Sequence, residues 1–209
     1  MADQSALSDQ VVREAARLGL ELQPAQARRL TLYLLLVERW GRRLNLTGRP
    51  DAADLVARQL ADAFVLAREL GVLEPLPTQV CDVGAGAGLT GLPLLVLRPG
   101  LSLGLVEATR RKCAFLRAAL HALGLAAVVH EERLERLSLP PHDLVLSRAT
   151  WSPQVWAELG APLLGPGGRL ACFLARDPAP VVSGLVEERR ADYQLADGSP
   201  RRLLLLRRA

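Results

Sequence analysis

Cysteine, histidine and lysine are all scarce in this chain of 209 residues, and each scarcity narrows what the chain can be. The three cysteines, Cys81, Cys113 and Cys172, stand far apart inside apolar segments. That spacing suits neither a disulfide framework nor a zinc cluster, so we expect three buried free thiols. The three histidines have no metal-ligand spacing either, and we expect no metal.

Long apolar runs are also missing. Arg, Glu, Gly or Pro interrupts the hydrophobic stretches, and residues 1–20 hold no apolar segment of the signal-peptide type. We therefore expect a soluble, unsecreted, cytoplasmic protein with no membrane partner. Half of the residues are hydrophobic, which is enough for one sizeable core, while the chain is too short for two ordinary domains with linkers. We expect a monomer.

The positive charge comes almost wholly from arginine, because Lys112 is the only lysine. The formal net charge is +4 and the isoelectric point is about 9.5. Such a chain permits a polyanionic partner such as RNA or DNA without requiring one.

Two patterns divide the chain. Through the first seventy residues, apolar side chains recur at helical spacing over 11–20, 25–44 and 55–70. After the Pro-rich segment 74–78, short apolar runs of strand length alternate with helical ones. We therefore expect a helical N-terminal extension over residues 1–74 that packs on the core, followed by a domain over 75–209.

The second pattern predicts an α/β fold with a doubly wound, mainly parallel sheet of seven strands. A last helix is predicted at Leu185–Arg190. A C-terminal antiparallel hairpin is predicted across Asp197-Gly198. The predicted strands are 79–84, 101–107, 126–131, 142–149, 169–175, 192–196 and 201–208, with helices at the glycine loop after the first strand and at 112–123 and 153–164.

The first predicted strand leads into a glycine-rich loop, D-V-G-A-G-A-G-L-T-G over residues 82–91. Its last six residues match G-x-G-x-x-G between a strand and a helix, and Glu107 ends the next strand about twenty residues on. This context is typical of a nucleotide-like cofactor bound at the carboxyl edge of a sheet. The glycines alone fit a nicotinamide dinucleotide as well as S-adenosylmethionine.

Asp82 favours one of the two cofactors. A carboxylate two residues before the first glycine would repel a pyrophosphate, whereas it suits the positive sulfonium and ammonium of S-adenosylmethionine. Glu107 can accept hydrogen bonds from the ribose hydroxyls. We favour S-adenosylmethionine, and an NAD-dependent oxidoreductase is the alternative. The plainer interpretation of Asp82 is a carboxylate that orders the loop.

Five short segments stand in a distinctive order along the chain. They are R-W-G-R-R-L-N-L-T-G (39–48), D-V-G-A-G-A-G-L-T-G-L-P-L (82–94), E-A-T-R-R-K-C-A-F-L (107–116), R-L-E (133–135) and S-R-A (147–149). Together they resemble the RsmG family, also called glucose-inhibited division protein B, which methylates a guanine of small-subunit ribosomal RNA.

The resemblance implies a Rossmann-like class I S-adenosylmethionine-dependent methyltransferase fold, with the extension on the RNA side. It implies methyl transfer to N7 of a guanine in 16S rRNA, as free small-subunit RNA or in the 30S subunit. Together with the loop analysis it gives a cofactor-binding set of Asp82, Gly84, Gly86, Gly88, Leu89, Glu107, Leu134, Glu135 and Arg148. The catalytic candidates are Arg148, Asn45 and Asp62. The RNA-binding candidates are Arg43, Asn45, Thr47, Arg58, Arg111 and Lys112.

The residue types agree with attack by a ring nitrogen. Guanine N7 has a free lone pair, so no general base is required. The known lysine-containing tetrad for ribose 2′-hydroxyl methylation needs two lysines, and this chain has one, which excludes that route. Carbon-5 methylation of a pyrimidine needs a thiolate nucleophile, and none of the three cysteines is well placed for it. Exocyclic-amine methylation usually presents Asn or Asp with Pro-Pro and an aromatic residue where this chain has Ser147-Arg148-Ala149. Trp151 suits stacking on an extruded guanine and core or lid packing equally.

The chain also differs from the family pattern. The differences are at Gln59, Ala63, Thr90 and Leu174-Ala175, where the family usually has His, Ser, Pro and Lys-Gly. They leave open the alternative of a family member that binds cofactor or RNA without turnover.

Overall fold

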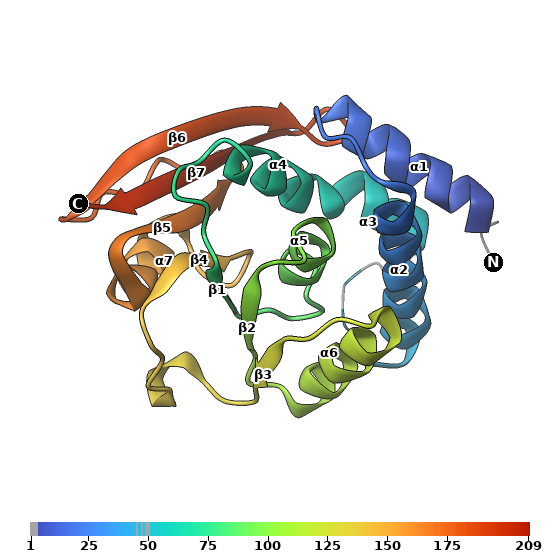
Figure 1. Cartoon of the computed structure of the whole chain (residues 1–209), viewed down its shortest axis with the longest axis horizontal. Helices are drawn as coiled ribbons and strands as arrows, with labels where there is room; N and C mark the ends of the chain where they lie inside the picture. Colours follow the sequence, from blue (N-terminus) through green and yellow to red (C-terminus); the bar gives the residue numbers. More distant parts are fainter. Residues whose placement is uncertain (1–3, 45, 47, 49–50) are drawn as a thin grey trace.

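The computed structural model describes residues 4–44, 46, 48 and 51–209 (Figure 1). In this part of the chain, seven strands form one sheet in the order β3-β2-β1-β4-β5-β7-β6. The strands are β1 (Gln79–Val83), β2 (Ser102–Val106), β3 (Val128–His130), β4 (His142–Ser147), β5 (Leu164–Leu174), β6 (Leu185–Gln194) and β7 (Pro200–Arg208). The helices are α1 (Gln4–Arg17), α2 (Pro24–Leu44), α3 (Ala52–Arg58), α4 (Leu60–Leu70), α5 (Gly91–Leu97), α6 (Arg110–Leu123) and α7 (Pro153–Gly160), with 3₁₀ turns η1 (Leu134–Arg136) and η2 (Ala161–Leu163).

The sheet is parallel except at its C-terminal hairpin. β1 pairs in parallel with β2 and β4, as do β2 with β3 and β4 with β5, whereas β7 runs antiparallel to both β5 and β6. The turn between β6 and β7 contains Gly198 with φ 80°, a left-handed conformation that glycine adopts without strain. The predicted Rossmann-like fold and its closing hairpin are therefore confirmed.

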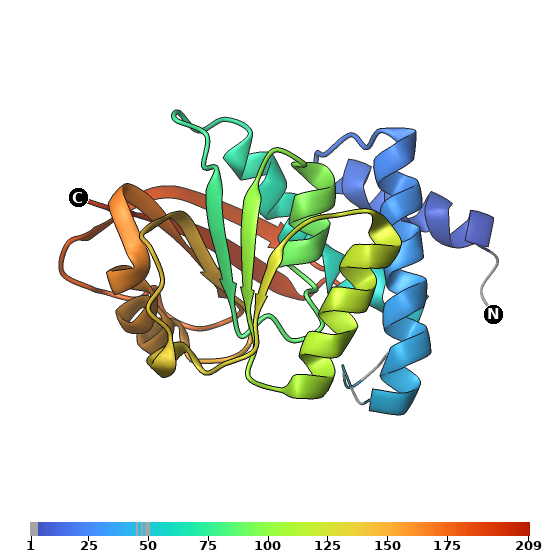
Figure 2. The ribbon, with the colours of Figure 1, turned by 60° about the horizontal axis from the view of Figure 1, so that its bottom comes forward.

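Different helices cover the two faces of the sheet (Figure 2). Along β1, Val80 belongs to the core shared with α1 to α6, while Cys81 packs in a second core with Trp156 of α7. In β7, Leu203 and Leu205 join the first core, while Leu204 and Leu206 join the second. A four-leucine run is suited to this strand because β5 and β6 flank it and both of its faces are covered.

The N-terminal helices pack directly on the sheet domain. The rings of Trp40 in α2 and Phe115 in α6 meet edge to face with centroids 5.8 Å apart. The single helix predicted over 55–70 is instead two helices, α3 and α4, which meet at Gln59. Gln59 has φ −118°, far from the value of about −63° in a regular helix, and its side chain is held by Arg148. A contact made across the fold therefore accompanies the break.

The helix predicted at Leu185–Arg190 is wrong, because these residues lie in β6. Glu187 pairs with Arg190 at 2.7 Å, as two residues three positions apart could also do on a helix. In the fold, however, β6 pairs with the whole length of β7 and covers its free edge, with an irregularity in register between Glu187 and Arg189. Tertiary pairing here overrides local propensity.

None of the described helices combines the length and the apolar character that crossing a bilayer demands.

Candidate functional site

The carboxyl ends of the parallel strands meet at one edge of the sheet, the lower edge in Figure 2, and three adjoining cavities lie there. The β2 cavity, about 540 Å³, is lined by residues 83–84, 106–108, 112, 132–135 and 149–151. The glycine-loop cavity, about 320 Å³, is lined by residues 46, 48, 59, 82, 84–87, 89–90, 112 and 148–150. The hairpin cavity, about 480 Å³, is lined by residues 58–59, 62, 148–149, 151–153, 173–175, 177, 195, 197, 199 and 201.

Two glycines of the loop, Gly86 and Gly88, have different structural roles. A Cβ added at Gly86 would meet nothing closer than 3.9 Å, so this bare backbone borders open space in the glycine-loop cavity. A Cβ at Gly88 would lie 2.8 Å from Leu116 and 2.9 Å from Leu92, and Gly88 lines none of the three cavities. Both residues have positive φ, 60° and 74°. Gly86 therefore suits a close ligand, while Gly88 lets the loop pack against α5 and α6.

Glu107 follows β2, and its carboxylate accepts hydrogen bonds from two backbone N–H groups. Its Oε2 accepts a hydrogen bond from Gly86 N at 2.9 Å, and its Oε1 accepts one from Thr109 N at 2.7 Å. Each carboxylate oxygen can accept a further bond, so the fixed carboxylate is still able to bind two neighbouring hydroxyls. Its place in the lining of the β2 cavity suits recognition of a ribose.

Asp82 has a structural contact as well as a place in the glycine-loop cavity. Its Oδ2 accepts a hydrogen bond from Gly91 N, the first residue of α5, at 3.0 Å. The side chain is buried, and burial raises the pKa of Asp82 to about 7 against the opposing effects of the Gly91 N–H and of Arg148. Asp82 thus orders the loop, and it ionises near neutral pH.

A buried network crosses the site from α4 to the C-terminal hairpin. Arg148, just after β4, donates from Nη1 to Asp62 Oδ2 at 3.0 Å and from Nη2 to Gln59 Oε1. Tyr193 of β6 donates its hydroxyl to the other oxygen of Asp62 at 2.5 Å. Asp62 is 5% exposed and Tyr193 is 8% exposed. Burial and the neighbouring carboxylate both raise the pKa of Tyr193 above its ordinary value, so the phenol remains a donor.

Ala149 stands where the three cavities meet, since it lines all of them. It has φ 57°, the only left-handed φ among the described residues other than glycine. Left-handed backbone costs a residue with a Cβ about 1–2 kcal/mol, and such strain is often found at functional sites. The turn allows Arg148 and Thr150, its two neighbours, to line the glycine-loop cavity together.

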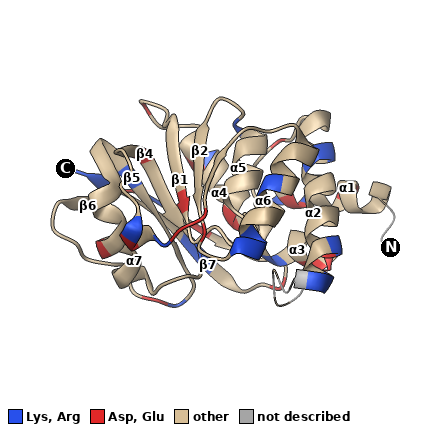
Figure 3. Cartoon of the chain, turned by 90° about the horizontal axis from the view of Figure 1, so that it is seen from below, with Lys and Arg blue, Asp and Glu red and all other residues tan. Residues whose placement is uncertain are grey.

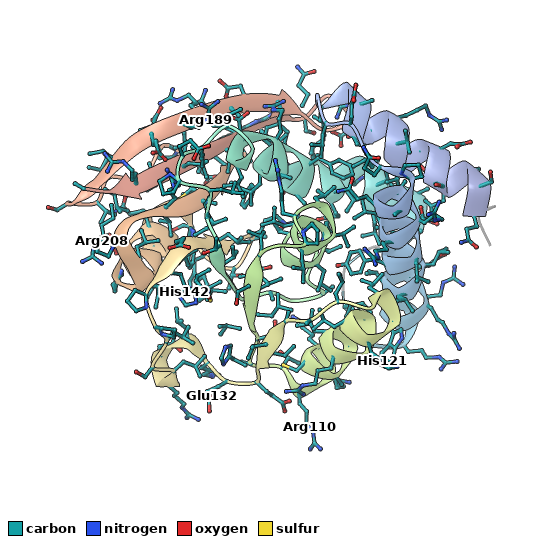
Figure 4. All side chains as sticks on the ribbon, in the orientation of Figure 1. Arg110, His121, Glu132, His142, Arg189 and Arg208 are labelled. Carbon is teal, nitrogen blue, oxygen red and sulfur yellow. The ribbon has the colours of Figure 1, made fainter. Side chains whose placement is uncertain are left out.

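Basic side chains flank the mouth of the cavities. Figure 3 shows blue segments at the start of α6 and at the neighbouring end of α2. Arg43 in the last turn of α2 and Arg111 in the first turn of α6 are exposed, and Arg110 projects outward in Figure 4. Lys112 lines both the β2 cavity and the glycine-loop cavity.

The fold brings most of the predicted site residues to this edge. Those that line a cavity are Arg58, Asp62, Asp82, Gly84, Gly86, Leu89, Glu107, Lys112, Leu134, Glu135 and Arg148. Asn45 and Thr47, predicted for catalysis and RNA binding, lie outside the described residues. The cavity lining agrees with the predicted roles but does not establish them, and they stay predictions.

Two tyrosines of the site were not foreseen from the sequence. Tyr193 anchors Asp62, and Tyr33 of α2, fully buried, donates its hydroxyl to the carbonyl oxygen of Ala87 in the glycine loop at 2.7 Å. These are the only tyrosines of the chain. The rarity of tyrosine in the chain could have marked both residues as candidates. Their hydrogen-bond partners, Ala87 and Asp62, lie 54 and 131 residues away in the sequence, so no local pattern could have identified them.

The thiols are poor nucleophiles in this fold. All three cysteines are buried, and burial raises the pKa of Cys81 and of Cys172 to about 12. Cys113 donates its Sγ hydrogen to the carbonyl oxygen of Glu107 at 3.0 Å. Thiolate catalysis therefore has no suitable group. Across the part of the chain that the structure describes, no three His, Cys, Asp or Glu side chains gather as metal ligands would.

Comparison with known sequences gives one consistent family. The family profile for rRNA small subunit methyltransferase G (GidB) matches residues 26–179. The ribosomal RNA small subunit methyltransferase G of Chromohalobacter salexigens is 36% identical over 200 residues, which cover 93% of this chain and 94% of that protein. The protein of the same name from Anaeromyxobacter sp. is 36% identical over 169 residues, covering 79% of this chain and 77% of its own.

Solved structures support the fold. TrmN from Thermus thermophilus superposes with a TM-score of 0.58 at 21% identity, covering 74% of this chain and 53% of that one. Magnesium protoporphyrin IX methyltransferase from Synechocystis, with bound SAH, gives a TM-score of 0.61 at 16% identity, covering 82% and 93%.

Proposed function

The chain belongs to the rRNA small subunit methyltransferase G family, and from that premise we propose that it transfers the methyl group of S-adenosylmethionine to N7 of a guanine in small-subunit rRNA. The observation that carries the proposal is family membership over most of the chain, together with a glycine loop and a ribose-type carboxylate at the same sheet edge. A nicotinamide-dependent oxidoreductase would not account for that membership.

The residues present fit the cofactor. The open backbone of Gly86 lines the glycine-loop cavity, and Glu107, Leu134 and Glu135 line the β2 cavity. The hydrogen bond between Gly86 and Glu107 joins the two linings. We assign the ribose to Glu107 and the adenine to Leu134 and Glu135. Gly84, Gly86 and Leu89 would hold the methionine side, with Asp82 behind them. When bound, S-adenosylmethionine supplies an electrophilic methyl group on a positive sulfur.

The chain's own residues have mainly to position the reactants. Guanine N7 carries a lone pair, so no side chain has to remove a proton before attack. Holding two reactants at near-attack distance in a site shielded from water is worth several kcal/mol, about 7–11 at the limit. Arg148, fixed by Asp62 and Gln59, stands between the glycine-loop cavity and the hairpin cavity and is suited to orient the base.

The RNA would approach over the basic surface beside the cavities. Exposed arginines at the end of α2 and the start of α6, among them Arg43 and Arg111, suit phosphate contacts. We propose that the helical extension 1–74 also takes part in RNA binding, as the family resemblance implies for Asn45 and Thr47. We further propose that the protein works as a monomer in the cytoplasm, where small ribosomal subunits are found, on rRNA or on the assembled 30S subunit.

Two assays test the proposal together. Calorimetry measures S-adenosylhomocysteine and NAD affinity, and labelled S-adenosylmethionine measures methyl transfer to naked small-subunit rRNA and to 30S subunits that lack the modification. We expect S-adenosylhomocysteine to bind more tightly than NAD, and label to enter at least one RNA. Cofactor binding without label in either RNA would instead support a family member without turnover.

A further inference from the structure

The hairpin cavity is a second chamber beside the one that suits the cofactor. The two share Gln59, Arg148 and Ala149 in their linings. A methyl acceptor has to reach the transferring methyl group, so a chamber that shares a wall with the cofactor side is where the acceptor belongs. Resting on the proposed function, we propose that the hairpin cavity receives the target guanine and that Arg148 identifies the base by donating to its O6 atom.

The guanidinium of Arg148 is a hydrogen-bond donor that is already held in place at the wall of the chamber. A guanidinium has five N–H donors, and among the described residues the hydrogen bonds to Asp62 and Gln59 use two of them. The side chain of Arg148 is 20% exposed, and Asp62 is held from its far side by Tyr193. The arginine therefore keeps donors for a ligand while its orientation is fixed by buried partners.

This donor suits guanine and disfavours adenine. Guanine O6 is an acceptor beside N7 on the same edge, so a single donor to O6 from Arg148, which lines both cavities, brings that edge to the wall they share and leaves the N7 lone pair unused. Adenine carries an amino group at the corresponding position. Its N–H hydrogens would face those of Arg148, leaving donors on both sides unpaired. The chamber thus selects the base and the atom together.

The walls and rim match the rest of a nucleotide. Trp151 lines the chamber and is stacked on Trp156 with ring centroids 5.9 Å apart and 12° between planes. Trp156 is itself fixed by a 2.9 Å hydrogen bond from Nε1 to the carbonyl of Ala171. A rigid aromatic wall suits an extruded planar base. Arg58 and Arg201 also line the chamber. Arg58 is paired with Asp54 at 2.8 Å and with Asp197 at 3.3 Å, so contact with a flanking phosphate falls mainly to Arg201.

Filling the chamber tests the assignment. Ser152 and Ala175 both line it and are exposed, and the Ser152 side chain makes no capping hydrogen bond to α7. We expect Ser152→Phe and Ala175→Phe to bind S-adenosylhomocysteine as wild type does, while methyl transfer to unmodified small-subunit rRNA falls about 100-fold because the base is misplaced. Ser183→Phe, at an exposed position that lines none of the three cavities, is the matched control and should keep wild-type transfer.

The outcomes separate this inference from the proposed function. Wild-type transfer by both filled variants would overturn the assignment of the chamber, and so would loss of cofactor affinity in both, because the chamber would then belong to the cofactor site. A wild-type protein that methylates no RNA would remove the proposed function, and this inference with it. The role of Arg148 has its own test. RNA with 2-aminopurine at the methylated position keeps N7 but lacks O6, and should react about 10- to 100-fold more slowly. An unchanged rate would refute that role.

Discussion

Tyr193→Phe removes one hydroxyl from the buried network and changes nothing else in the shape of the side chain. In the folded protein that hydroxyl donates at 2.5 Å to Asp62, whose other oxygen accepts from Arg148 at 3.0 Å. A hydrogen bond to a charged group contributes about 1.5–3 kcal/mol, and Asp62 has little access to replacement water at 5% exposure. We expect the free energy of unfolding to fall by an amount in that range.

The effect on catalysis should exceed the effect on cofactor binding. Asp62 with one unpaired oxygen is free to turn and to carry Arg148 with it, and a displacement of about 1 Å at a reacting centre can cost about 100-fold in rate. We therefore expect kcat for methyl transfer to fall about 10- to 100-fold. Affinity for S-adenosylhomocysteine should stay within about twofold of wild type, since Tyr193 lines none of the three cavities described above.

The chain offers a matched control in its other tyrosine. Tyr33 is also buried, but its hydroxyl binds the carbonyl of Ala87 in the glycine loop. Tyr33→Phe should lower the free energy of unfolding by about 0.5–1.5 kcal/mol and weaken S-adenosylhomocysteine binding, because it loosens the loop. Urea unfolding, calorimetry and single-turnover transfer distinguish the two variants. Wild-type kcat in Tyr193→Phe, measured on folded protein, would refute the positioning argument.

Three further predictions concern other parts of the site. Burial raises the pKa of Asp82 to about 7 from 3.8, so the folded protein holds a proton that the unfolded chain releases, and wild type loses stability as pH rises through that window. The free energy of unfolding of Asp82→Asn, measured with urea and compared with that of wild type, should therefore rise by about 2 to 3 kcal/mol from pH 5 to pH 8. If the variant and wild type differed by the same amount at both pH values, this prediction would be contradicted. Gly86→Ala should weaken S-adenosylhomocysteine binding about tenfold in calorimetry, whereas Gly88→Ala should mainly lower stability, by about 2–4 kcal/mol, and the reverse pattern would show that the loop is misassigned. Arg43→Ala and Arg111→Ala should each lower the salt dependence of RNA binding by about one counterion without changing cofactor affinity, and an unchanged salt slope in filter binding would remove them from the RNA surface.

The fold was predictable wherever local pattern decides it. Short apolar runs placed the parallel strands, and Asp197-Gly198 placed the hairpin turn, because the residue types at those positions limit the backbone by themselves. The segment Leu185–Arg190 was not predictable, since its extended conformation depends on pairing with β7, which follows it in the chain. The break at Gln59 has the same character, because Arg148 holds its side chain from 89 residues away.

The candidate site was predictable in its motifs and not in its network. The order of strand, glycine loop and acid brought Gly86 and Glu107 together, and they are joined by a 2.9 Å hydrogen bond. The motif could not tell that Gly88 packs on helices while Gly86 faces open space, since both glycines look alike in sequence. Nor could it find Tyr193, whose tie to Asp62 exists only after the sheet has formed.

The identity of the methylated nucleoside tests the central claim most directly. Small-subunit rRNA that lacks the modification is incubated with the protein and labelled S-adenosylmethionine, digested to nucleosides and analysed by mass spectrometry. We expect the label in 7-methylguanosine, and we expect this product to be lost in Gly86→Val, where a side chain would enter the open space beside the loop. Label in any other nucleoside, or none in RNA while the cofactor is bound, would contradict it.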